Sequence, residues 1–124
     1  MENLRIEKTR YTLEVELNKD TGILEMTGSS YPENALDFFT PIIEWIKNFI
    51  TTIKKPVVLH LRVSYLNTSS TKCILDIFEI LEQYYQSKGK VEVNWYYAEG
   101  DEDIKETGEE LCEDIDLPFN FIAY

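Results

Sequence analysis

The apolar positions near the N-terminus alternate with polar ones. Leu13, Val15 and Leu17 are each separated by one polar residue, a turn follows over residues 18–22, and a second alternating run begins after it. Because successive side chains of a strand point to opposite faces, this alternation predicts two strands with one apolar face each. We interpret the segment as an antiparallel β-hairpin with one face in water.

The period then changes from two residues to the three or four of a helix. The apolar residues that follow helical spacing are Phe39, Ile42, Ile43, Ile46, Phe49, Ile50 and Ile53. Thr40-Pro41 matches an N-cap followed by proline at the first helical position. The sequence therefore predicts a main helix that begins near Pro41, after a short turn led by Pro32.

Two further strands and two further helices follow. The run 56–63 carries apolar residues on both faces, which is typical of a central strand covered on both sides. His60 within it is expected to be packed or hydrogen-bonded rather than a metal ligand. The next helix should end near Lys88-Gly89, and residues 90–98 alternate as another strand. Apolar residues at helical spacing within 101–116 predict a helix with an acidic outer face, and residues 119–124 a last strand.

This order of elements, ββαβαβαβ, predicts an α/β fold with a mixed sheet, an N-terminal hairpin and about three helices. Strands that are joined through helices should be parallel, with right-handed crossovers. A chain of 124 residues has the size of one domain, so we expect a single domain over residues 1–124.

Composition narrows the classes of partner. The formal net charge is -11, from 12 Lys+Arg and 23 Asp+Glu, and a chain so acidic is a poor binder of nucleic acid or anionic lipid. No apolar run is long enough to cross a bilayer, so a cytoplasmic location is expected. Cys73 and Cys112 are expected to be buried free thiols, and with His60 as the one histidine we expect no metal site and no cofactor.

Four consecutive hydroxyl side chains, Thr68 to Thr71, stand between an apolar run and the following amphipathic helix. One explanation is capping, since Asn67, Ser69 or Thr71 can accept a hydrogen bond from a free N–H at a helix start. The other is that the position receives a phosphate, because a helix N-terminus at the carboxyl edge of a sheet favours an anion. Both roles are compatible, and Ser69 to Lys72 also satisfies S-x-x-K, a weak match to a catalytic serine motif.

The segments LNTSSTKCILDIFEILE and SYPENALDFFTPIIEWI resemble the SiaC family of bacterial regulatory phosphoproteins, whose fold is similar to that of STAS domains, the anti-sigma-factor antagonists. The resemblance implies a partner-switching protein without catalytic residues of its own. It implies that a cognate kinase phosphorylates Thr68, that a metal-dependent Ser/Thr phosphatase reverses this, and that the unphosphorylated form binds and activates a diguanylate cyclase. The alternative is a STAS-type interaction module or anti-sigma-factor antagonist with another target. STAS antagonists usually carry Asp-Ser where this chain has Asn67-Thr68, which favours the narrower family.

The segment from Tyr31 to Asn34 leaves one strand and enters the first helix. It is interpreted either as an ordered turn, with Pro32 fixing φ and Asn34 capping, or as a direct partner contact. The family resemblance adds support to contact, and the ordered turn remains the other interpretation. The expected partner interface comprises Tyr31, Pro32, Glu33, Asn34, Asn67, Ser69, Ser70 and Thr71.

Overall fold

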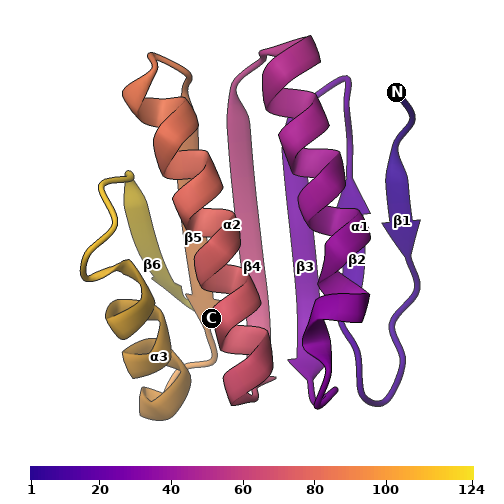
Figure 1. The fold of residues 1–124 in the computed structure, drawn as a ribbon. Helices are drawn as coiled ribbons and strands as arrows, with labels where there is room; N and C mark the ends of the chain where they lie inside the picture. The colour runs from indigo at the N-terminus through magenta and orange to yellow at the C-terminus, as the bar shows by residue number, and fades with distance from the viewer.

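The computed structural model describes the whole chain, residues 1–124, as a six-stranded sheet with three α-helices (Figure 1). The strands lie side by side in chain order from β1 to β6; β1–β2 and β2–β3 are antiparallel, and the remaining pairs are parallel. The elements are β1 (Leu4–Ile6), β2 (Glu14–Leu17), β3 (Ile23–Ser30), α1 (Ala35–Asn48), a π-helical turn η1 (Phe49–Ile53), β4 (Val57–Leu66), α2 (Thr68–Gln86), β5 (Val91–Tyr97), α3 (Glu102–Cys112) and β6 (Phe119–Ala123).

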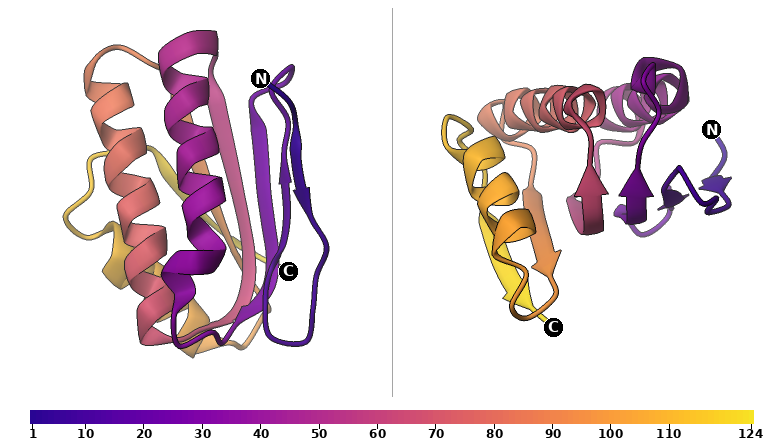
Figure 2. Two further views of the ribbon diagram at one scale, coloured as in Figure 1. Left: turned by 45° about the vertical axis from the view of Figure 1, so that its right-hand side comes forward. Right: turned by 90° about the horizontal axis from the view of Figure 1, so that it is seen from below.

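All three helices cover the same face of the sheet, as both views in Figure 2 show. The strand order explains this, because each right-handed crossover from β3 onward advances by one strand in the same direction and so places its helix on the same side. The prediction that residues 56–63 form a strand covered on both sides was therefore wrong. In β4 the residues Leu59, Leu61 and Val63 are buried under the helices, while His60 and Arg62 on the other face are only half-buried.

Most of the predicted elements are present, with two differences. The hairpin is β2–β3, and the α/β class is confirmed, but a short strand, β1, precedes the hairpin, so the order is βββαβαβαβ. The first helix begins at Ala35, not near Pro41, which lies inside α1. Thr40 does not cap; its hydroxyl donates to the carbonyl of Leu36 at 2.7 Å.

The core lies between the helices and the covered face of the sheet, where 27 buried apolar residues form one cluster. One close approach tightens it: a Cβ at Gly108 of α3 would lie 2.6 Å from ring atoms of Trp95 on β5, and the Trp95 indole N–H donates to the carbonyl of Ile104 at 3.0 Å. Glycine at 108 therefore lets α3 lie directly on the sheet. None of the helices is both long and apolar enough to span a bilayer.

Candidate functional site

The hydroxyl stretch forms the first turn of α2, at the edge of the sheet where the parallel strands end. Asn67 is the N-cap: its backbone is extended, and its side-chain oxygen accepts from the N–H of Ser70 at 2.8 Å. Its amide nitrogen donates to the carbonyl of Pro32 at 2.8 Å, and its backbone N–H donates to the carbonyl of Ser30 at 3.1 Å. One asparagine thus caps α2 and binds the end of β3 and the loop after it.

Three of the four hydroxyls have partners within the chain. Ser70 is fully buried, and its hydroxyl lies 2.6 Å from the hydroxyl of Ser30. Thr71 donates to the carbonyl of Asn67 at 3.0 Å, and Ser69 accepts from the N–H of Ala35 at 3.2 Å. The partner contact expected of Ser70 does not fit its complete burial.

Thr68 differs from the other three. Its side chain is exposed, and its hydroxyl has no hydrogen-bond partner within the chain. It stands at the first position of α2, where the partial positive charge of the helix N-terminus favours an anion. Lys72, one turn further along α2, is also exposed. Of the four hydroxyls, Thr68 is the one that an incoming enzyme reaches without breaking an internal bond.

The loop from Tyr31 to Asn34 lies against this turn, as the sequence suggested. Its carbonyl at Pro32 and the first N–H of α1, at Ala35, are bonded to Asn67 and Ser69 respectively. The prediction that the Asn34 side chain caps α1 was wrong. Asn34 occupies the N-cap position, but its side chain accepts no bond from the helix and instead donates to Asp37 at 3.0 Å. The cap of α1 comes from a different helix.

Sequence reasoning missed two tyrosines at this edge. Tyr31 stacks on Tyr65, with ring centroids 4.8 Å apart and planes inclined by 22°, and Tyr11 meets Tyr31 edge to face at 6.3 Å. A bulge in β4 brings Tyr65 there: Gly28 pairs with Val63 but Ser29 pairs with Tyr65, which leaves one residue unpaired and turns Tyr65 to the face without helices. The three residues are far apart in sequence, and no local signal links them.

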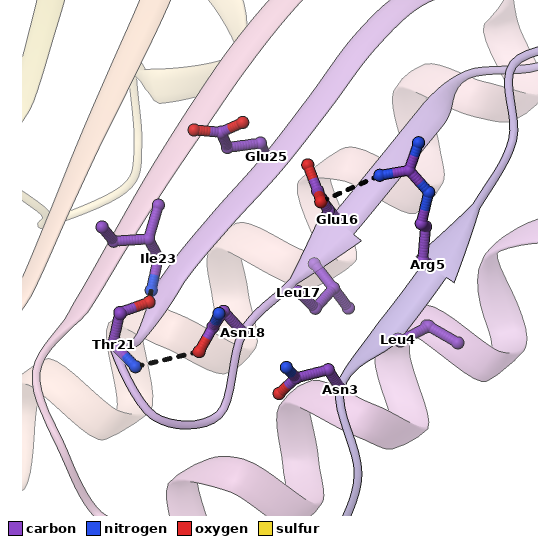
Figure 3. A pocket seen from close by; sticks show the side chains of 9 residues that line it. All are labelled: Asn3, Leu4, Arg5, Glu16, Leu17, Asn18, Thr21, Ile23 and Glu25. Carbon is purple, nitrogen blue, oxygen red and sulfur yellow. Dashed lines mark hydrogen bonds and ion pairs between the residues drawn. The ribbon is translucent and has the colours of Figure 1, made fainter.

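Other parts of the molecule offer weaker candidates. The hollow of about 440 Å³ in Figure 3 lies among β1, β2 and the start of β3, at the opposite edge of the sheet from Thr68. Its Arg5 is already paired with Glu16 at 2.9 Å.

On the face without helices, the His60 ring nitrogen lies 3.0 Å from the Tyr96 hydroxyl, so the expectation that His60 is hydrogen-bonded is confirmed. No three His, Cys, Asp or Glu side chains are grouped as metal ligands.

The two cysteines are not bonded to each other. Cys73 on α2 is buried, as expected, but Cys112 at the end of α3 is only half-buried. Desolvation by burial raises the pKa of the Cys73 thiol, and Asp76 raises it further. Burial likewise raises the pKa of Cys112. A raised pKa keeps both thiols protonated and weakly nucleophilic near neutral pH.

The fold and the site together define a class of protein: a small mixed α/β domain with an exposed, unbonded hydroxyl at the start of a helix. The chain belongs to the SiaC family, because the family model described as SiaC family regulatory phosphoprotein matches residues 6–124. This confirms the resemblance inferred from the sequence.

Relatives of known structure match the chain along its whole length. The crystal structure of apo-SiaC from Pseudomonas aeruginosa is 36% identical, with a TM-score of 0.92, covering 99% of this chain and 100% of that one. SiaC in the crystal structure of the diguanylate cyclase SiaD in complex with its activator SiaC, from the same organism, is 37% identical, with a TM-score of 0.94 and coverage of 98% and 99%. An uncharacterised protein of P. aeruginosa strain UCBPP-PA14 is 37% identical over 124 residues, which are 100% of this chain and 98% of the relative.

Proposed function

We propose that this chain binds and activates a diguanylate cyclase in its unphosphorylated form, and that reversible phosphorylation of Thr68 switches the binding off. The observation that carries the proposal is the difference among the four hydroxyls: Thr68 alone is both exposed and free of hydrogen bonds within the chain. Support for the target comes from SiaC of P. aeruginosa, which is the activator of the cyclase SiaD.

Phosphorylation at this position should leave the fold intact. A phosphate brings about -1.5 to -2 charges near neutral pH. At the N-terminus of α2 the helix dipole favours such a charge by roughly 0.3–1 kcal/mol, and Lys72 lies one turn away at the spacing of a helical ion pair. Because Thr68 has no internal bond to lose, the modified side chain remains in water.

The same charge acts differently once a partner covers the site. A dianion that is enclosed in an interface without a cationic match loses its hydration, which costs on the order of several kcal/mol. About 1.4 kcal/mol already changes affinity tenfold. Phosphorylation therefore separates the partners while the free domain stays folded, and a cognate kinase and a metal-dependent Ser/Thr phosphatase are the enzymes that the switch requires.

A second candidate function is a STAS-type interaction module or anti-sigma-factor antagonist in which the hydroxyls only cap helices. The bonds of Ser69 and Asn67 to neighbouring backbone fit that role. They do not account for Thr68, which caps nothing. The catalytic alternative based on S-x-x-K is weaker still, because Ser69 accepts a bond from α1 and no side-chain acid or base is paired with it.

The test compares wild type, Thr68→Ala and Thr68→Glu in binding to the purified cognate cyclase. Thr68→Ala should bind and activate the cyclase within a few fold of wild type, whereas Thr68→Glu should bind at least about tenfold more weakly because its carboxylate stands in for the phosphate charge. For both variants the free energy of unfolding, measured in urea, should lie within about 0.5 kcal/mol of the wild-type value.

Intact-mass measurement after incubation with the cognate kinase and ATP supplies the matched control. One phosphate should be added to wild type and none to Thr68→Ala. The Ser69→Ala variant should still accept one phosphate, because the proposed acceptor is Thr68. In the wild type the Ser69 hydroxyl is instead bonded to the N–H of Ala35. Equal cyclase binding by the phosphorylated and unphosphorylated forms would refute the switch, and an unfolded Thr68→Glu variant would refute its physical basis.

A further inference from the structure

The three tyrosines at the carboxyl edge of the sheet form an exposed aromatic cluster, which we call the tyrosine cluster: Tyr11, Tyr31 and Tyr65. The three residues remain 59%, 47% and 44% exposed although the rings contact one another. None of the three hydroxyls has a hydrogen-bond partner in the chain, in contrast to Tyr84 and Tyr96, whose hydroxyls are both bonded. The cluster is thus not explained by the needs of the fold.

Backbone contacts hold the cluster in place. The N–H of Tyr31 donates to the carbonyl of Tyr11 at 2.9 Å, which joins the loop before β2 to the end of β3. The next residue, Pro32, is bound by the side chain of Asn67. Tyr65 belongs to the hydrogen-bonded part of β4 beyond its bulge. Rings that are already ordered lose little entropy when a partner covers them, which is a property of strong interface anchors.

The cluster and Thr68 lie close together. Tyr65 precedes Thr68 by three residues, so their Cα atoms are at most about 11 Å apart. The Asn67 side chain, next to Thr68, is bonded to the residue that follows Tyr31. A protein that covers the rings is therefore expected to reach the neighbourhood of Thr68.

We propose that the tyrosine cluster is the apolar anchor through which the unphosphorylated chain binds its cyclase, and that its occupant is an apolar segment of that enzyme. The inference rests on the proposed function. The rings carry no charge in a chain of net charge -11, so they offer a neutral docking point beside Thr68. A phosphate at the border of an apolar contact loses its water, and the single charge of Lys72, one turn along α2, does not balance a dianion, so one modified group suffices to weaken the contact.

The size of the cluster agrees with an anchor and not with a whole interface. Three half-exposed tyrosines present about 300 Å², given roughly 200 Å² for a full ring side chain. A stable interface needs about 800 Å² from each partner. The cluster is thus too small to hold two copies of this chain together by itself, but it matches the aromatic centre of a larger contact, where tyrosines dominate binding.

The experiment measures cyclase affinity for Tyr31→Ala/Tyr65→Ala, with Tyr85→Ala on the far end of α2 as the exposed-tyrosine control. The double variant should bind at least tenfold more weakly, and the control within twofold of wild type. Tyr31→Phe/Tyr65→Phe should bind within threefold, because the rings and not the hydroxyls form the contact. If the double alanine variant fails to fold, Tyr11→Ala in the loop takes its place, with an expected loss of at least threefold.

The outcomes separate this inference from the proposed function. If the double variant binds the cyclase normally while Thr68→Glu does not, the anchor is wrong and the switch stands. If the double variant loses binding but Thr68→Glu retains it, the anchor stands and the switch is wrong. Loss of Thr68 phosphorylation with normal cyclase binding would assign the cluster to the kinase, and tyrosine-dependent dimers of the free chain would assign it to a second copy; either result overturns the inference.

Discussion

Asn67 shows how one polar residue can organise a site at the scale of single bonds. Its side-chain oxygen accepts a hydrogen bond from the N–H of Ser70, in the first turn of α2. Its side-chain nitrogen donates to the carbonyl of Pro32, in the loop after β3. The sequence indicated the first role, because asparagine is common at helix starts. The second depends on where the loop after β3 lies, which no local pattern contains.

Replacing this residue should cost more than replacing a similar asparagine nearby. We expect Asn67→Ala to lower the free energy of unfolding by about 2 kcal/mol, roughly half from the lost cap and half from the lost bond to Pro32. Asn34→Ala should change it by less than about 0.5 kcal/mol, since Asn34 makes no cap bond and its contact with Asp37 is exposed. Urea unfolding of both variants gives the comparison, and equal losses would contradict the assigned roles.

At the scale of elements, the start of α1 shows how tertiary contact overrides a local signal. Thr40-Pro41 matches a helix start, and Pro41 provides no backbone N–H for the interior of α1. The helix nevertheless begins at Ala35, because Ser69 of α2 accepts the N–H there. A cap that is supplied by another helix leaves no mark in the sequence around the helix it caps.

The contact of α3 with the sheet gives a prediction at the same scale. Gly108→Ala should destabilise the domain by about 2 kcal/mol, although alanine favours a helix by about 1 kcal/mol, because the new methyl group would overlap the Trp95 ring. The cost should shrink in a Trp95→Phe background, where the smaller ring leaves space. Thermal unfolding of the four variants of this cycle measures the coupling, and a stabilising effect of Gly108→Ala in the native background would show that α3 is not held against Trp95.

For the whole molecule, the order of strands decides which surfaces are available. Three successive crossovers in one direction put every helix on one face and leave the other face to polar side chains such as His60 and Arg62. They also bring the carboxyl ends of β3 and β4 together at one edge (Figure 1), and Tyr31 and Thr68 follow these two strand ends in the chain. The distance along the chain between Tyr11 and Thr68 is irrelevant to this meeting.

Global stability should fall in alkaline solution. Burial raises the pKa of Cys73 and Cys112 above the ordinary 9.0, and that of Tyr84 above 10.0. Below about pH 9 these groups are protonated in both states and their contribution is fully present; as pH rises further the unfolded chain ionises first, and stability is lost. Urea midpoints from about pH 7 to pH 10 should therefore decline, and the Cys73→Ala/Cys112→Ala variant should decline less steeply. A midpoint that rose across this range would contradict the assigned direction.

The sequence by itself determined the elements whose side chains repeat at a fixed period: the β2–β3 hairpin, α2, α3 and the strands between them, together with the α/β class and the family. It also placed Thr68 at a helix start, and the family resemblance grouped the 31–34 loop with it in one expected interface. It missed β1, which has three residues and is too short to show a period. Periodicity reports only which face of an element is apolar, so it predicts the elements but not the contacts between them.

Tertiary structure alone decided the rest. It assigned Ser69 to cap α1, buried Ser70 against Ser30, and left Thr68 free, although the four hydroxyls are equivalent in sequence. It also gathered the tyrosine cluster from a loop, a strand end and a bulge. Both results depend on contacts between residues 20 to 40 positions apart, and such contacts are set by the packing of the sheet and helices rather than by neighbours along the chain.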